Sequence, residues 1–164
     1  MNEKLKNSIV YVSIINNKSE PILMKNYNHS KQEELNFQMN IFATLDMIDN
    51  QISKKILVSE NKSQISSFLG CLNSVYLAED EFDIYGFYTV GQLKILVILR
   101  QKSNMANYDE RHIKNLMNEI YQFYRQDILN PFNQNIDDHQ LSKKFHSKLD
   151  ETINKYQEIL KKGI

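Results

Sequence analysis

The sequence predicts an α+β fold of element order ββαβββαα, in which three helices cover the faces of one five-stranded antiparallel sheet. Three observations predict it. Five short runs are rich in β-branched and aromatic residues and are bounded by turn residues, as strands are. Three longer stretches repeat their apolar residues with helical periodicity. The strands follow one another through hairpin-type connections, which make the sheet antiparallel.

The N-terminal part of the chain predicts a hairpin followed by a helix. Residues 8–17, SIVYVSIINN, form the first expected strand, and residues 20–27, EPILMKNY, form its partner. Pro21 stands at the start of the second strand, where a missing N–H is tolerated. Residues 31–52 lack Pro and Gly and have helical periodicity, so they predict a helix. Residues 53–65 are polar apart from a short Ile-Leu-Val island, and we interpret them as a connection.

The middle of the chain predicts three more strands, over residues 67–76, 82–89 and 92–99. Val90 and Gly91 form the expected tight turn between the last two strands. The longest apolar run of the chain, LKILVIL, lies in the last of them and is much too short to cross a bilayer.

The C-terminal third predicts two amphipathic helices. Asp109 is a good N-cap for a helix that runs to about Leu129. Its apolar face carries Ile113, Leu116, Met117, Ile120, Tyr121, Tyr124 and Ile128. Pro131 ends this helix, and Asp137 or Asp138 is expected to cap the last one. The last apolar face carries Leu141, Phe145, Leu149, Ile153, Tyr156 and Leu160.

The composition points away from nucleic acids and from disulfide frameworks. Its 164 residues are enough to bury the core of one domain. Lys plus Arg and Asp plus Glu balance at 20 each, so no overall field favours nucleic acid or an anionic membrane. Cys71 is the only cysteine, which excludes an internal disulfide, and we expect it to be buried and inert in its strand. The apolar run at 8–15 lacks a small-residue cleavage site, so we expect no signal peptide.

No motif of catalytic or cofactor chemistry stands out in the sequence. A phosphate-binding loop needs closely spaced glycines, but the four here are scattered at Gly70, Gly86, Gly91 and Gly163. Metal-ligand spacing is absent from the histidines, which are His29, His112, His139 and His146. No nucleophile-elbow pattern occurs either. We therefore expect no metal, no nucleotide, no other cofactor and no enzymatic activity.

The first helix carries two apolar stripes. The face that docks on the sheet is expected to hold Phe37, Ile41, Leu45, Ile48 and Ile52. About a third of a turn away lies a second group, which we call the helix-1 surface and which consists of Leu35, Met39, Phe42, Asp46 and Asp49. Apolar residues mixed with carboxylates are typical of a surface for another protein. The same pattern also arises where a loop or another helix of the same chain covers these residues.

The tripeptide Asn130-Pro131-Phe132 admits two interpretations. As a short linear motif, Asn-Pro-Phe is a peptide ligand that certain endocytic modules capture. As a helix end, Pro131 removes the N–H that the next turn would need, and Phe132 can bury its ring beside Leu129.

Four segments together resemble the sedlin-like family, the longin-fold small subunits of the TRAPP vesicle-tethering complex, and above all its subunit 2-like branch. The likeness runs from about Ser8 to Leu149. It rests on an E-L-x-F to Leu-Asp-x-Ile-Asp spacing, an Asp-Ile-Tyr-Gly-Phe-x-Thr strand, a helix that ends in Asn-Pro-Phe, and a Ser-x-x-Phe. These motifs stand here as ELNFQMNIFATLDMIDNQI, DIYGFYT, DERHIKNLMNEIYQFYRQDILNPF and LSKKF.

The resemblance implies a longin (profilin-like) fold with one helix on one face of the sheet and two on the other. It implies one domain over 1–164, with a core at about 8–150 and a helical C-terminal extension at 151–164. Tyr85 and Gly86 would belong to its strand motif. Asn130, Pro131 and Phe132 would end the penultimate helix, with Phe132 buried.

The function that the resemblance implies is a non-enzymatic scaffold or adaptor subunit of a TRAPP-like vesicle-tethering and Rab-exchange complex in ER–Golgi and Golgi trafficking. Such a subunit is cytoplasmic and peripheral at those membranes. Its direct partners are other TRAPP-like subunits, reached through the helix-1 surface, and a Rab/Ypt GTPase is engaged only through the complex. No nucleic acid is expected as a partner.

Two alternatives stay open at this point. One is the regulatory longin domain of a SNARE or a coat-adaptor small chain, although a SNARE needs a tail with sustained heptads. The other is a small-ligand binding domain or an unrecognised hydrolase, which requires a cleft with perturbed titratable groups.

Overall fold

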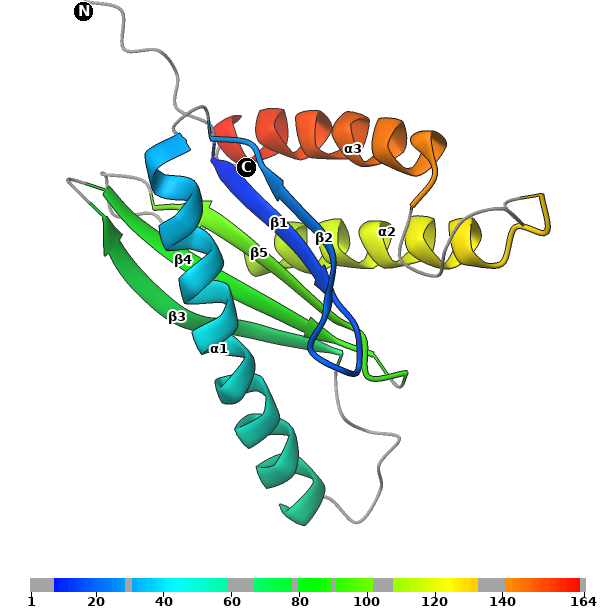
Figure 1. Ribbon diagram of the computed structural model, residues 1–164. Coiled ribbons are helices and arrows are strands. Elements are labelled where there is room, and N and C mark those ends of the chain that lie inside the picture. Colours follow the sequence, from blue (N-terminus) through cyan, green and yellow to red (C-terminus); the bar gives the residue numbers. More distant parts are fainter. Residues whose placement is uncertain are drawn as a thin grey trace, which may run out of the picture.

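Five strands form one antiparallel sheet in the computed structural model, which describes residues 8–28, 31–58, 67–77, 80–89, 91–101, 108–132 and 141–162. In chain order the elements are β1 (Ile9–Ile15), β2 (Pro21–Asn26), α1 (Lys31–Val58), β3 (Phe68–Leu77), β4 (Asp80–Tyr88), β5 (Lys94–Arg100), α2 (Glu110–Ile128) and α3 (Lys143–Lys162). The strands are arranged β2-β1-β5-β4-β3, and all neighbouring pairs are antiparallel (Figure 1). The predicted fold class and element order are confirmed.

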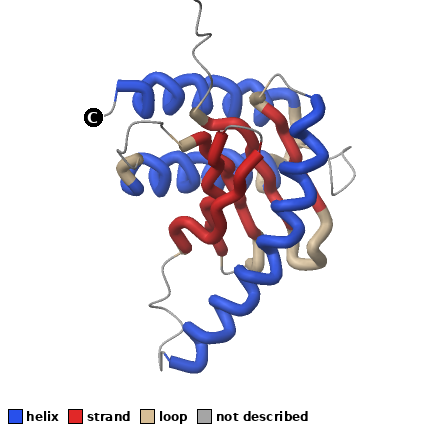
Figure 2. Tube along the Cα trace, turned by 90° about the vertical axis from the view of Figure 1, so that its left-hand side faces the viewer, coloured by secondary structure: helices blue, strands red, loops and turns tan. Residues whose placement is uncertain are grey.

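The sheet is the middle of three layers. α1 crosses one face, and α2 and α3 lie beside each other on the opposite face (Figure 1). The view turned by 90° shows the same separation of the helices by the strands (Figure 2). Each face of the sheet has its own buried apolar cluster. One helix on one face and two on the other is the arrangement that the sequence predicts.

The central strand, β5, is buried from both sides. Ile95, Val97 and Leu99 belong to the cluster under α2 and α3, whereas Leu96 and Ile98 belong to the cluster under α1. A strand with two buried faces needs apolar side chains at every position. This requirement explains why its sequence is a continuous apolar run without polar alternation.

The first helix buries the predicted face and is longer than predicted. The five expected core residues are all buried: Phe37, Ile41, Leu45, Ile48 and Ile52. The helix continues to Val58, so the interpretation of residues 53–58 as a connection is wrong. They contain neither Pro nor Gly, and a polar composition alone does not end a helix. Residues 59–66 lie outside the described part of the chain.

Gly86 in β4 makes room for a leucine of the neighbouring edge strand. The β3–β4 register shifts between Cys71 and Asn73, which pair with Tyr85 and Ile84, so Leu72 is an extra residue of β3 at this point. A Cβ at Gly86 would lie 2.4 Å from Leu72 Cδ1, closer than real Cβ contacts allow. The adjacent Tyr85 faces the other side of the sheet, where its ring stacks on Phe68 at a centroid distance of 6.4 Å. Tyr85 therefore packs in the cluster under α2 and α3, whereas Gly86 leaves space for Leu72 on the α1 side of the sheet.

Asp109 caps α2, as the sequence predicts. Its Oδ1 accepts a hydrogen bond from the backbone N of Arg111 at 3.0 Å, and the Arg111 guanidinium donates to the same carboxylate. The Arg111 side chain, together with that backbone bond, lowers the pKa of Asp109 to about 2. The cap therefore stays ionised at neutral pH at the helix end that favours negative charge. The turn after β4 contains Val90, which lies outside the described residues.

A serine, not the expected aspartates, caps α3. Ser142 Oγ accepts a hydrogen bond from the backbone N of Phe145 at 3.1 Å, which is the N-cap geometry. The carboxylate of Asp127, in the last turn of α2, accepts a hydrogen bond from Ser142 N at 2.9 Å and another from Ser142 Oγ. Asp137 and Asp138 lie outside the described residues, and α3 begins only at Lys143. The Ser-x-x-Phe motif thus ties the end of α2 to the start of α3.

The second half of α3 is hydrogen-bonded to the N-terminal end of β1. Gln157 is 5% exposed, and its Oε1 accepts hydrogen bonds from the backbone N of Ser8 and of Ile9, both at 2.9 Å. Its Nε2 donates to Ile9 O at 2.8 Å. Ile153, Tyr156 and Leu160 join the buried cluster from the same stretch, so a domain core that ends near residue 150 would divide a packed helix. The assignment of 1–164 to one domain remains a prediction.

We predict that Gln157→Ala lowers the free energy of unfolding by roughly 2–5 kcal/mol, because it leaves several buried backbone groups without a hydrogen-bond partner. Urea denaturation followed by circular dichroism measures this loss. Gln122→Ala, at an exposed glutamine of α2, is the matched control and should change the value by less than about 0.5 kcal/mol. Equal losses in the two variants would contradict the role of Gln157.

Candidate protein-binding surface

The described residues contain no group of three or more His, Cys, Asp or Glu side chains placed to hold a metal ion. Within the same residues, no helix has the length and apolar character needed to span a membrane. Cys71 lies in β3 as predicted but is exposed, so the expectation of a buried thiol is wrong. The reason is that β3 is an edge strand of the sheet.

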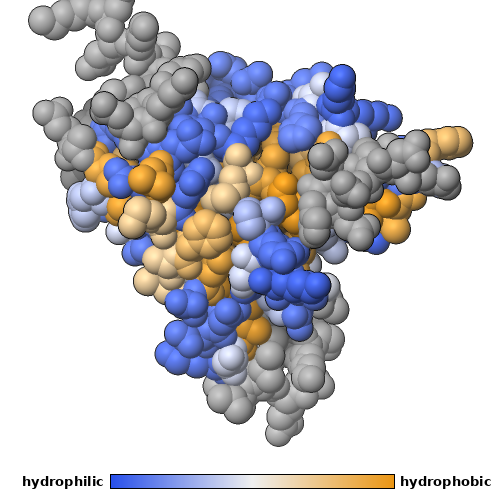
Figure 3. Space-filling view, in the orientation of Figure 1, coloured by the Kyte–Doolittle hydropathy of each residue, from blue (hydrophilic) through white to orange (hydrophobic). Residues whose placement is uncertain are grey.

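The helix-1 surface is open to solvent in the structure. Leu35 is 62% exposed, Met39 63% and Phe42 43%, and the side chains of Asp46 and Asp49 are also exposed. Hydrophobic residues run across the face of the molecule that α1 occupies (Figure 3). The other apolar stripe of α1, about a third of a turn away, packs against the sheet. The apolar side chains of the helix-1 surface therefore have no role in the described core. No described loop or helix covers them, which removes the simpler interpretation for the described residues.

A further methionine of α1 was not predicted. Met47 is 40% exposed. At 3.6 residues per turn it falls on the other flank of the buried face, away from the helix-1 surface. The two flanks of one helix are therefore distinguishable by substitution.

The two carboxylates of the helix-1 surface are in different situations. Asp49 Oδ1 accepts a hydrogen bond from Lys94 Nζ at 2.7 Å, and the side chain of Lys94 is only 7% exposed. A nearly buried ammonium needs such a counter-ion, so Asp49 already has a structural role. Asp46 makes no hydrogen bond or ion pair with the described part of the chain. Of the pair, Asp46 is the carboxylate that is available to another molecule.

The helix end at Asn130 is exposed, contrary to expectation. Pro131 follows the last turn of α2 as predicted, but Phe132 is 92% exposed and Leu129, its expected neighbour, is 71% exposed. The prediction that Phe132 is buried is wrong. Asn130 Oδ1 accepts a hydrogen bond from Phe132 N at 3.0 Å, and this turn directs the ring away from the sheet. The last turn of α2 also projects beyond the strands (Figure 1).

A family model described as Sedlin matches residues 14–155 of the chain, from β1 to the middle of α3. The chain belongs to the sedlin family. No individual curated protein matches the sequence. Sedlin-family membership indicates a trafficking subunit of the TRAPP type, in a family that is non-catalytic. The exposed stripe on α1 lies within the residues that match the sedlin model.

We predict that Phe132→Ala changes the free energy of unfolding by less than about 0.5 kcal/mol, because the ring makes little contact with the rest of the chain. Phe145→Ala is the matched comparison, since this ring is 2% exposed, and it should cost roughly 3–5 kcal/mol. Chemical denaturation of both variants measures the difference. A loss of several kcal/mol at Phe132 would show that the ring is buried in solution.

Proposed function

We propose that this sedlin-family chain is a non-catalytic adaptor subunit of a TRAPP-like vesicle-tethering and Rab-exchange complex in ER–Golgi and Golgi trafficking. It is cytoplasmic, and it reaches those membranes through the complex. Its direct partners are other TRAPP-like subunits. A Rab or Ypt GTPase is engaged by the assembled complex and not by this subunit alone.

The exposed helix-1 surface is the observation that supports an adaptor role. Full burial of a large apolar side chain contributes roughly 1.5–3 kcal/mol, so Leu35, Met39 and Phe42 together can anchor a partner. Asp46 lies beside them with its carboxylate available for a charge-assisted bond to an Arg or Lys of that partner. The buried stripe holds α1 rigidly on the sheet, so little ordering is needed on binding.

We predict that Met39→Asp greatly reduces assembly with TRAPP-type subunits and leaves thermal stability unchanged. The reason is that Met39 is 63% exposed in the isolated chain and would be buried only in the complex. Affinity purification of the tagged protein, with co-purified subunits quantified by mass spectrometry, measures assembly, and a thermal melt measures stability.

Met47→Asp is the matched control, because it makes the same chemical change on the other flank of α1. It should leave subunit recovery intact. If Met39→Asp recovers normal amounts of the other subunits, or if both variants lose them equally, the assignment of the helix-1 surface is wrong.

We predict that alanine separates the roles of the two carboxylates. Asp49→Ala removes the counter-ion of Lys94 and should lower the free energy of unfolding by about 1–2 kcal/mol. Asp46→Ala should change stability by less than about 0.5 kcal/mol and yet reduce subunit recovery. Denaturation curves and quantitative pull-downs distinguish the two. The reverse pattern would assign the structural role to Asp46.

A further inference from the structure

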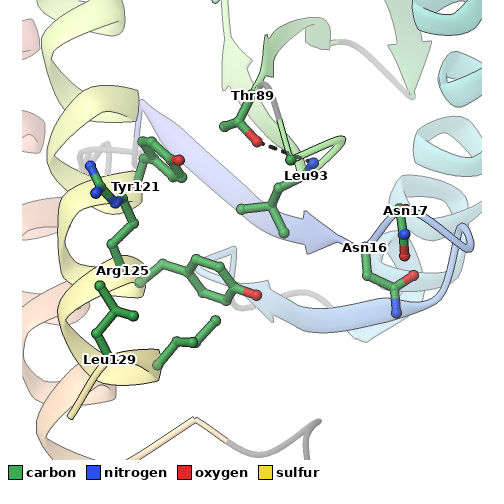
Figure 4. A pocket seen from close by; sticks show the side chains of 10 residues that line it. Asn16, Asn17, Thr89, Leu93, Tyr121, Arg125 and Leu129 are labelled. Carbon is green, nitrogen blue, oxygen red and sulfur yellow. Dashed lines mark hydrogen bonds between the residues drawn. The ribbon is translucent and has the colours of Figure 1, made fainter.

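A groove of about 460 Å³ lies at one end of the molecule, where two β-turns meet the C-terminal half of α2. Asn16 and Asn17 come from the turn between β1 and β2, and Thr89, Gly91 and Leu93 come from the connection between β4 and β5. The helix contributes Tyr121, Tyr124, Arg125, Ile128 and Leu129. Tyr121 and Arg125 lie on the helix side of the opening, and Leu93 and Asn16 lie on the side of the β-turns (Figure 4). A groove of this size accommodates a few amino-acid side chains.

Much of the wall of the groove is apolar, and a hydrogen bond and packing on the core hold it in place. Leu93 is 7% exposed, and its backbone N donates to Thr89 Oγ1 at 3.1 Å. The Tyr121 ring rests on the buried Phe87 at a centroid distance of 5.9 Å. Burial raises the pKa of Tyr124, so its hydroxyl remains a neutral hydrogen-bonding group. The site therefore exists before a ligand arrives, which lowers the entropic cost of binding.

Among the described residues of the lining, Arg125 is the one with an ionised side chain. Its guanidinium lies 5.7 Å from the centroid of the Tyr121 ring, and no carboxylate of the described residues pairs with it. Two acidic residues of the adjoining segments have other partners. Glu20 accepts a hydrogen bond from Asn16 Nδ2 at 3.0 Å, and Asp127 accepts two from Ser142. An occupant that brings its own carboxylate would thus be complementary to the groove.

The apolar surface continues beyond the groove. Ile128 and Leu129 line it and are 55% and 71% exposed, and Phe132 follows them at 92%. A small ligand confined to the groove would leave the Phe132 ring in water. A polypeptide can cover both the groove and the exposed helix end. This end of α2 lies on the opposite side of the sheet from α1, so its occupant does not compete with a partner on the helix-1 surface (Figure 2).

We propose that this groove is a second docking site, which binds a partner-protein segment carrying a large apolar side chain next to a carboxylate. The apolar side chain packs against Leu93 and Tyr124, and the carboxylate bonds to Arg125. The proposal goes beyond the adaptor role of the helix-1 surface, and its test does not use TRAPP-type subunits.

The test is a titration of the ¹⁵N-labelled full chain with three blocked tetrapeptides, acetyl-Asp-Leu-Phe-Asp-amide, acetyl-Lys-Leu-Phe-Lys-amide and acetyl-Asp-Ala-Ala-Asp-amide. The first should cause saturable shifts of the amides at 89–93 and 121–129. It should bind at least about tenfold more tightly than either of the others, a factor that corresponds to one charge-assisted bond or one buried side chain. No saturable shifts at these residues, or equal affinities, overturns the proposal.

Charge reversal adds a second criterion. Arg125→Glu should invert the preference, so that the lysine peptide binds better than the aspartate peptide. Lys114→Glu, an exposed position near the other end of α2, is the matched control and should leave the preference unchanged. An unchanged preference in Arg125→Glu overturns the role of Arg125. A response to phosphatidylserine vesicles with none to the peptides would assign the site to a lipid surface instead, and would also overturn the proposal.

Discussion

The burial of β5 from both sides is the constraint on which the rest of the structure depends. A central strand with apolar side chains on both faces must be covered twice, once by α1 and once by α2 with α3. Each covering helix needs only one stripe for that task. The other stripe of α1 and the C-terminal end of α2 are therefore exposed to solvent. Both binding surfaces that we propose contain these exposed residues.

Most of the fold could be predicted because its signals are local. Apolar periodicity identified the buried faces of α1 and α3, and Asp109 marked the start of α2 through side-chain chemistry that acts over a few residues. The errors have a common origin in tertiary position. Cys71 is exposed because β3 is an edge strand of the described sheet, and Phe132 is exposed because the end of α2 extends beyond the strands. Neither edge is visible in a local pattern.

Among the candidate surfaces, too, features within one segment could be predicted, and features that depend on the tertiary fold could not. The exposure of Leu35, Met39 and Phe42 follows from helical geometry within one segment, so a helical wheel was enough to find them. The ion pair between Asp49 and Lys94 joins positions that are 45 apart in the sequence, and it could not be anticipated. The groove beside Arg125 is built from three segments that only the fold brings together, namely the turn after β1, the residues Thr89, Gly91 and Leu93, and the C-terminal half of α2. No sequence signal marks such a site.

The bonds from Gln157 to the first strand have a consequence for how the chain is made. β1 is synthesised before the other described strands, but the backbone of Ile9 bonds to a side chain 148 positions later, and its neighbouring strand β5 is also distant in the sequence. Contacts this distant close only after a large loss of chain entropy, which slows folding. Until α3 has been synthesised, the apolar strand Ile9–Ile15 lacks its bonds to Gln157 and part of the apolar cover of one face, even when β2 and β5 are already paired with it. Among the described elements, α3 thus completes the packing of a strand that is synthesised well before it.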